Sequence, residues 1–309
     1  MVWNIILIIV GVAMVLGGAD RLTEGASALA RRMNIPEIII GLTIVAAGTS
    51  APELFVSLVS ALKGTPDMAM GNVVGSNTMN AMLIVGCAAM VAPMTISRST
   101  VRKDIPFSVA ASVLLILIAF DAFLGRVDGI ILLLGFAAFM TYTLLQAKKG
   151  RSESPVEIKL LNPWLSVFYV LLGLTLLVAG SNIFVDSASR VAYSLGISEG
   201  VVGLTIVAGG TSLPELATSV VAARKGQSAI AIGNVIGSNV FNILLILGFT
   251  AILSPMQIQG ITIVDMGMML GSVALVWLFS YTRFTVERWE GAVLVGGFLI
   301  YLGWLLSNV

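Results

Sequence analysis

The sequence predicts an all-α membrane protein with ten transmembrane helices, arranged as two inverted five-helix repeats with broken helices at the membrane midplane. Three observations lead to this fold class. The 309 residues are 58% hydrophobic and only 11% charged, whereas soluble domains carry about 25% charged residues. Long apolar segments follow one another along the whole chain, and two polar motifs each occur twice at one common spacing.

The apolar segments define the predicted membrane spans. A helix that crosses the bilayer needs roughly 20 mostly apolar residues. The N-terminal segment has no basic region and no clear cleavage site, so we interpret it as a first span and not as a signal peptide. The first and sixth spans can run longer, because 20–34 and 184–196 are also compatible with a helix. The ten predicted spans are 2–19, 37–62, 68–92, 105–124, 128–147, 162–183, 199–223, 228–253, 262–281 and 290–307.

The distribution of basic residues predicts the orientation in the membrane. Fourteen of the 17 Lys and Arg residues lie in the loops after spans 1, 3, 5, 7 and 9, and three lie on the other side. Loops rich in Lys and Arg stay in the cytoplasm. The sequence therefore predicts a multi-pass protein with both termini extracytoplasmic, and it places the polar linker 148–161 inside the cell.

Composition excludes several classes of function. The net charge of +1 gives no indication of a nucleic-acid partner. The chain has no histidine, which excludes histidine metal ligands and His-based catalytic triads. An intramembrane hydrolase using Ser50 or Ser212 would lack a His base, and neither serine lies in a G-x-S-x-G elbow. We therefore expect no enzyme activity, no cofactor and no obligate protein partner.

The chain contains an internal duplication. Residues 41–54 and 203–216 are identical at twelve of fourteen positions, at an offset of 162 residues. Residues 71–80 and 233–242 are identical at seven of ten positions at the same offset. The predicted organisation is a first five-span repeat over 1–147, the linker 148–161 and a second repeat over 162–309. Because five is odd, the two copies cross the membrane in opposite directions, an arrangement typical of secondary transporters.

Two acidic residues lie deep within predicted spans. Glu53 and Glu215 occupy equivalent positions in the two repeats, whereas the other 14 acidic residues lie in loops or near span ends. A carboxylate at this depth costs several kcal/mol or more, so it marks a functional site. No basic residue lies mid-span beside either glutamate, which indicates a cation from solution as the partner.

The residues around the glutamates are suited to a hard cation. Thr49 and Ser50 precede Glu53 by four and three residues, so they share one side of a helix with it. Pro52 has no N–H and disturbs the preceding turn, which frees main-chain carbonyl oxygens there. Hydroxyl, carbonyl and carboxylate oxygens suit calcium and sodium. The second repeat offers the same types of residue at Thr211, Ser212, Pro214 and Glu215.

The second motif adds neutral oxygens. Ser76 and Asn80 are four residues apart, as are their repeat-mates Ser238 and Asn242, and we expect all four to contact the ion. Packing between helices is the alternative, since small and amide residues favour close contact in membranes. Asn77 and Asn239 are predicted to bond the main chain of a neighbouring broken helix; for Asn72 and Asn234 the sequence predicts no role.

The paired motifs resemble those of a known family. Gly48–Leu54 with Gly71–Asn80, repeated as Gly210–Leu216 with Gly233–Asn242, is similar to the two alpha-repeats of the sodium/calcium exchanger family. That family belongs to the calcium:cation antiporter superfamily. The resemblance covers essentially the whole chain and implies a secondary antiporter that exchanges Ca²⁺ for Na⁺ by alternating access. The short central linker favours a microbial form in the cell membrane of a prokaryote.

The resemblance implies a role for each matching residue. Glu53 and Glu215 are expected to be the central calcium ligands, which also contact sodium. The other implied ligands are Thr49 and Thr211 at the centre, Ser50, Ser212, Ser76 and Ser238 at flanking sodium sites, the carbonyls of Ala46 and Ala208 for sodium, and Asn80 and Asn242 lining the centre.

One position departs from the family pattern. Several relatives carry Asp where this chain has Asn80 or Asn242. The departure argues against coupling to potassium or protons more than against calcium binding. An H⁺/Ca²⁺ antiporter, a K⁺-dependent antiporter and a cation channel remain the alternative interpretations.

Overall fold

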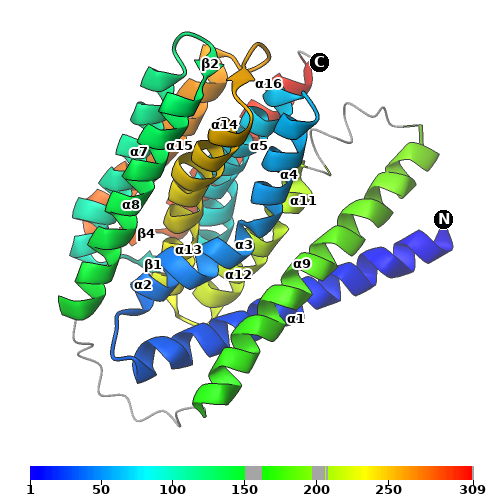
Figure 1. Ribbon diagram of the computed structural model, residues 1–309. Coiled ribbons are helices and arrows are strands. Elements are labelled where there is room, and N and C mark those ends of the chain that lie inside the picture. The colour runs from blue at the N-terminus through cyan, green and yellow to red at the C-terminus, as the bar shows by residue number, and fades with distance from the viewer. Residues whose placement is uncertain (150–161, 197–205, 207, 308–309) are drawn as a thin grey trace.

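The computed structural model describes residues 1–149, 162–196, 206 and 208–307, which form a helical bundle (Figure 1). The helices of the first half are α1 (Val2–Arg32), α2 (Glu37–Ile40), α3 (Ala46–Thr49), α4 (Ala51–Leu62), α5 (Pro66–Met79), α6 (Val85–Val91), α7 (Ile105–Ile118) and α8 (Arg126–Lys149). Those of the second half are α9 (Pro163–Ser194), α11 (Ala208–Thr211), α12 (Leu213–Arg224), α13 (Ser228–Val240), α14 (Gly248–Leu253), α15 (Ile263–Arg283) and α16 (Arg288–Ser307).

The length and composition of these helices identify a multi-pass membrane protein. Within the described residues, seven helices are long and apolar enough to cross a membrane, or up to eight if one bent pair counts as a single span. The predicted extensions of the first and sixth spans are confirmed, because α1 continues to Arg32 and α9 to Ser194. The start of the predicted span 199–223 and most of the linker 148–161 lie outside the described residues.

One predicted boundary is wrong. The span predicted over 105–124 ends early, because α7 stops at Ile118. Ala122 adopts a left-handed conformation with φ of 60°, which turns the chain before the short strand β2 (Phe123–Leu124). Hydropathy alone did not detect this turn, since residues 113–120 are almost entirely apolar.

The predicted break in the motif helix is present. Segments Glu37–Thr49 and Ala51–Leu62 meet at an angle of 46°. The break falls at Ser50, with φ −81° and ψ 7°, and its repeat-mate Ser212 has nearly the same conformation, with φ −89° and ψ 6°. A proline follows each serine within the first turn of the next helix, where its missing N–H costs no helical hydrogen bond.

Several helices also contain wider π-helical turns, which the sequence did not predict. These segments are η1 (Gly41–Val45), η2 (Asn80–Ile84), η3 (Thr100–Asp104) and η5 (Phe241–Leu247). Such turns are uncommon and are frequently found at functional sites. Asn80 begins η2 and Asn242 lies in η5, so both amides are presented from an altered helical turn.

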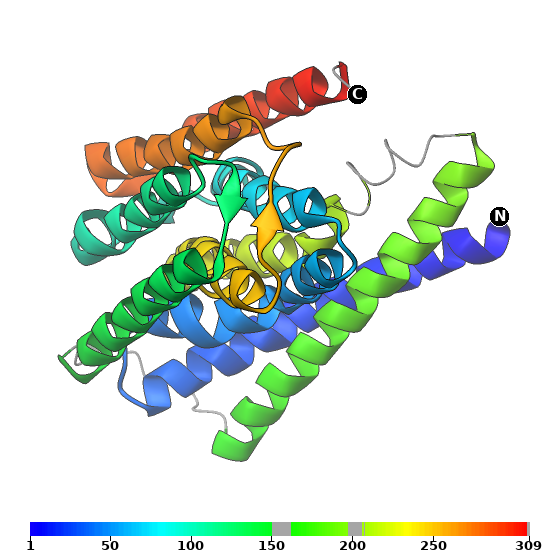
Figure 2. The same cartoon turned by 45° about the horizontal axis from the view of Figure 1, so that its top comes forward.

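Two short strand pairs connect the halves. Strand β1 (Met94–Thr95) pairs with β4 (Thr285–Val286), and β2 pairs with β3 (Met256–Gln257), both antiparallel. Strands β1 and β3 are repeat-mates, and so are β2 and β4. The first strand of each half therefore pairs with the second strand of the other half. The pair β2–β3 is visible at the front of Figure 2.

Helices α1 and α9 cross each other on one side of the bundle, opposite α15 and α16 (Figure 2). They run antiparallel with their backbones in contact at glycines. A Cβ added at Gly11 would lie 2.8 Å from the carbonyl oxygen of Gly180, and one at Gly18 would lie 2.8 Å from that of Gly173. Larger residues at these positions would force the two helices apart.

Candidate ion-binding site

The two polar motifs lie on the most deeply buried helices. The spans Pro66–Val91 and Ser228–Leu253 are 78% and 83% buried, whereas Arg126–Ala147 is only 17% buried and faces outward. The helices with the second motif are therefore the interior of the bundle, and the broken helices with the first motif pack against them. This arrangement brings residues from both halves to one central location.

The two glutamates are held by serines from the opposite half. Glu53 is 1% exposed and Glu215 is fully buried. The Ser50 hydroxyl donates to Glu215 Oε1 at 3.1 Å, and the Ser212 hydroxyl donates to Glu53 Oε1 at 3.1 Å. Each broken helix thus supplies a hydroxyl to the carboxylate of the other, and the two contacts are related by the repeat.

Two asparagine pairs also cross between the halves. Asn80 Nδ2 donates to Asn239 Oδ1 at 3.0 Å, and Asn242 Nδ2 donates to Asn77 Oδ1 at 3.0 Å. Asn77 Nδ2 additionally donates to the main-chain oxygen of Asn239 at 3.2 Å. Asn77 therefore bonds a main-chain oxygen of α13, the second-motif helix of the other half, and not a broken helix as the sequence predicted.

These contacts leave four acceptor oxygens unused. Among the described residues, the second carboxylate oxygen of each glutamate and the amide oxygens of Asn80 and Asn242 are buried and accept no hydrogen bond. Each such atom costs about 1–3 kcal/mol, and of the ten buried side-chain atoms without a partner in the described residues, these four belong to the residues that form the contacts above. The four atoms form two repeat-related pairs, which makes them a set of oxygen donors suited to a cation.

The charge of the site comes from the two glutamates. The described residues contain three salt bridges, and none involves Glu53 or Glu215. They also contain no group of three or more His, Cys, Asp or Glu residues that could hold a metal ion. With both glutamates ionised, the site carries a charge of −2 surrounded by neutral oxygens.

Two further predicted ligands of the first repeat make contacts of their own. The Thr49 hydroxyl donates to Asn234 Oδ1 at 3.0 Å and lies 3.4 Å from the Ala46 carbonyl oxygen. The same Ala46 oxygen accepts the main-chain N–H of Ser50 at 3.0 Å. In this conformation the Ala46 carbonyl is therefore engaged in the helix, although we expected it to be free for sodium.

The remaining predicted ligands are two serines of the second motif and two residues at the start of the second broken helix. The Ser238 hydroxyl donates to Glu215 Oε1 at 3.4 Å, and its repeat-mate Ser76 on α5 is buried. Thr211 is 8% exposed, and Ala208 begins α11.

Sequence reasoning assigned no role to Asn72 and Asn234. Asn234 is fully buried and donates to the Glu215 carbonyl oxygen at 3.2 Å and to Ser219 Oγ at 3.0 Å. Asn72 donates in the same way to the Glu53 carbonyl at 3.1 Å and to Ser57 Oγ at 2.9 Å. Their presence in both copies of the motif was the available signal, since the helix that each one contacts cannot be read from spacing.

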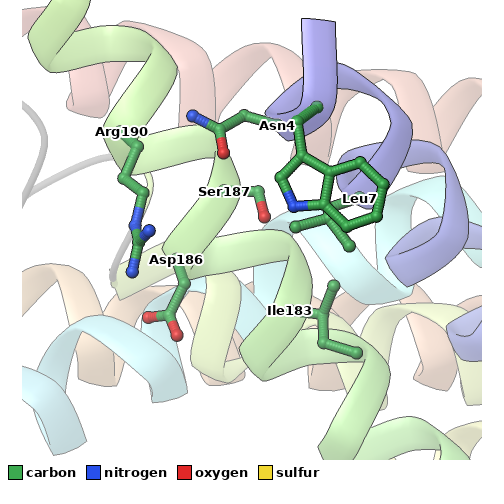
Figure 3. Close-up of a pocket in the computed structure, with 7 residues that line it drawn as sticks. Asn4, Leu7, Ile183, Asp186, Ser187 and Arg190 are labelled. Carbon is green, nitrogen blue, oxygen red and sulfur yellow. The ribbon is translucent and has the colours of Figure 1, made fainter. Parts of the chain in front are cut away.

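A separate pocket lies on the surface between α1 and α9. Its lining includes Asn4 near the start of α1, with Asp186 and Arg190 on α9 (Figure 3). It contains a single carboxylate and none of the predicted ligands. We therefore place the candidate ion site at the buried glutamates and not in this pocket.

Comparison with known proteins matches this description. The family model described as sodium/calcium exchanger protein matches residues 3–145 and again residues 165–307. This chain belongs to the sodium/calcium exchanger family. The two matches are offset by the same 162 residues as the motifs, so the family's own unit is the repeat.

Members of the sodium/calcium exchanger family align with nearly the full chain. A putative antiporter, CaxA of Alkalimonas amylolytica, is 36% identical over 98% of this chain and 98% of its own length. The sodium/calcium exchanger MaX1 of Methanosarcina acetivorans is 30% identical over 97% of each chain. A solved structure of the sodium-calcium exchanger NCX_Mj superposes with a TM-score of 0.87 at 29% identity, covering 98% of this chain and 99% of that one.

Proposed function

We propose that this protein is a secondary active antiporter that exchanges Ca²⁺ for Na⁺ across the cell membrane of a prokaryote by alternating access. The observation that carries the proposal is the set of four buried acceptor oxygens on Glu53, Glu215, Asn80 and Asn242. Membership in the sodium/calcium exchanger family supports it, as does the similarity to the putative antiporter CaxA and the sodium/calcium exchanger MaX1.

The donor set fits calcium in charge and in chemistry. Ca²⁺ takes 6–8 oxygen ligands from carboxylates, amides, carbonyls and water. Two ionised glutamates balance one divalent ion, and the neutral oxygens of Asn80 and Asn242 add ligands without further charge. In this role Thr49 and Thr211 contribute hydroxyl oxygens to the same centre.

Sodium would use the same carboxylates and the flanking positions. We assign Ser50, Ser212, Ser76 and Ser238, with the carbonyls of Ala46 and Ala208, to sodium coordination. Because the Ala46 oxygen accepts the main-chain N–H of Ser50 in this conformation, its use by sodium requires the turn before Ser50 to open. Competition for shared oxygens makes binding of the two ions mutually exclusive, which is the basis of exchange.

Alternating access follows from the two repeats. We infer ten membrane helices in two inverted halves, 1–147 and 162–309, joined by the linker 148–161. Equivalent contacts in both halves, such as Ser50 with Glu215 and Ser212 with Glu53, support a site at the interface of the repeats. Exchange of the two halves' conformations would open this site to either side in turn.

The orientation is proposed from the basic residues. With both termini extracytoplasmic, a cysteine placed between Lys148 and Arg151 in a Cys87→Ser background is expected to be inaccessible to an impermeant thiol reagent outside intact cells. The same cysteine is expected to react once the cells are permeabilised. Labelling from outside at the rate of a control cysteine placed near Met1 would overturn this orientation.

The alternatives differ in the coupling ion. A neutral Asn242 in place of a third carboxylate argues against a requirement for K⁺, because an added monovalent ion beside Ca²⁺ would leave uncompensated positive charge in a buried site. An H⁺/Ca²⁺ antiporter would use the same glutamates, and a cation channel would conduct without a coupled gradient.

One experiment separates these alternatives. Purified protein in proteoliposomes is assayed for ⁴⁵Ca²⁺ uptake under an outward Na⁺ gradient, with K⁺ fully replaced by choline, and then under K⁺ and pH gradients alone. We expect uptake with Na⁺ only. Uptake that follows the pH gradient, or that requires restored K⁺, would refute sodium coupling without potassium, and flux in any gradient at channel rates would refute antiport.

A further inference from the structure

Asn234 connects the two halves of the site without being one of its proposed ligands. Its amide group donates to the Glu215 carbonyl oxygen at 3.2 Å and to Ser219 Oγ at 3.0 Å, both on α12. Its amide oxygen accepts the hydroxyl proton of Thr49 at 3.0 Å, from α3 in the other half. All three hydrogen bonds are formed by one fully buried side chain.

The contact with Thr49 determines which part of the hydroxyl is available to an ion. A threonine hydroxyl has one proton and two lone pairs. A cation can be coordinated only by a lone pair, so the proton must point elsewhere. Asn234 Oδ1, at 3.0 Å, is closer to this hydroxyl than the Ala46 carbonyl oxygen at 3.4 Å, and the Glu215 carboxylate interacts with the same hydroxyl.

The residue type at 234 fits this task. Asparagine has both an acceptor and two N–H donors on one short side chain, and Asn234 uses all three. Aspartate would keep the acceptor for Thr49 but lose both donors to α12. Leucine has a similar size and would lose the acceptor as well.

We propose that Asn234 is a positioning residue that raises cation affinity through Thr49. It takes up the Thr49 proton, so that the hydroxyl offers only lone pairs to the ion, and it fixes α12 relative to α3 while doing so. This inference rests on the proposed function, because it assumes that Thr49 is an ion ligand. The competing explanation is that Asn234 only packs α13 against α12, in which case its effect on the ion is independent of Thr49.

A double-mutant cycle distinguishes the two explanations. The Thr49→Val substitution is made in wild-type, Asn234→Leu and Asn234→Asp backgrounds, and the Ca²⁺ concentration for half-maximal exchange is measured in proteoliposomes with equal protein content. We expect Thr49→Val to raise this concentration about tenfold in the wild type, as for loss of one oriented contact. The same increase is expected with Asp at 234, which still accepts the proton, and less than about twofold with Leu.

Two additions keep the test decisive. Asn182→Leu, on the exposed side of α9, is the matched control for an asparagine lost from a membrane helix and is expected to leave the Ca²⁺ dependence unchanged. If Asn234→Leu does not reach the membrane, Asn234→Ser is used with the same expectation, because serine is too short to reach Thr49.

The outcomes separate this inference from the proposed function. An equal effect of Thr49→Val in all three backgrounds, with active wild-type protein, would overturn the role of Asn234 and leave the exchange activity standing. Wild-type protein that neither binds Ca²⁺ in a thermal-shift titration nor moves it would instead overturn the proposed function itself.

Discussion

The contacts between serines and glutamates at the centre of the molecule obey the internal repeat, whereas one ion pair at its periphery does not. At the centre, Ser50 and Ser212 each donate to the opposite glutamate at 3.1 Å. At the end of α12, Lys225 forms an ion pair with Asp20 of α1 at 2.6 Å. The repeat-mates of those two residues are Lys63 and Asn182, which have no such charge complementarity. A contact needed in both access states should occur in both halves, while a contact found in one half can favour one state over the other.

The largest expected effect is at the carboxylates. Glu53→Gln and Glu215→Gln each remove one charge from a site that balances a divalent ion. One pair of charges 4 Å apart contributes about 4 kcal/mol at an effective dielectric of about 20, which is about a thousandfold in affinity. We expect both variants to lose Na⁺-driven ⁴⁵Ca²⁺ uptake. Near-normal uptake by either variant would show that the two glutamates are not equally required for Ca²⁺ transport.

The serine contacts are expected to have the next largest effect. Ser50→Ala and Ser212→Ala each remove a hydrogen bond to a carboxylate, and such bonds contribute about 1.5–3 kcal/mol. We expect each substitution to weaken the apparent Ca²⁺ affinity at least about tenfold, and the two values to agree within about threefold. Ser57→Ala, whose hydroxyl bonds the main chain and Asn72, is the comparison for loss of a buried hydroxyl. A large difference between Ser50→Ala and Ser212→Ala would show that the site is used asymmetrically.

The peripheral ion pair is expected to have the smallest effect. The side chains of Lys225 and Asp20 are 30% and 45% exposed, and exposed pairs contribute about 0.2–1 kcal/mol. Asp20→Asn should therefore change the exchange rate less than about fivefold while the Ca²⁺ affinity stays at its wild-type value. A loss of affinity comparable to that of the serine variants would mean that this contact belongs to the ion site.

The sequence predicted features that lie within each half, but it did not predict the contacts between the halves. Hydropathy and duplication predicted the spans, and the buried carboxylates of Glu53 and Glu215 followed from their depth. The bonds of Asn234 could not be predicted, because Thr49 is 185 residues away and in the other half. No propensity rule marks a π-helical turn such as the one that Asn80 begins, since it differs from an α-helical turn by its i→i+5 hydrogen bonds and not by a characteristic residue type.

The length of the first helix has a similar physical cause. The first span was predicted to end at residue 19 because Asp20, Arg21 and Glu24 follow it closely. The helix continues because these charges find partners: Asp20 pairs with Lys225, and Arg21 pairs with Glu24 one turn later. Pairing across helices is a tertiary effect that charge content does not reveal, so only the helix-compatible residues 20–34 indicated the longer span that is observed.

The central claim is that the unused oxygens of Glu53, Glu215, Asn80 and Asn242 form the cation site. Anomalous diffraction from crystals soaked in Sr²⁺, a heavier analogue of Ca²⁺, tests it most directly. We predict the strongest peak between Glu53 Oε2 and Glu215 Oε2, lost when Na⁺ replaces Sr²⁺ in excess. A strongest peak elsewhere, for example beside Asp186 on the surface of α9, with none between the glutamates, would contradict the account.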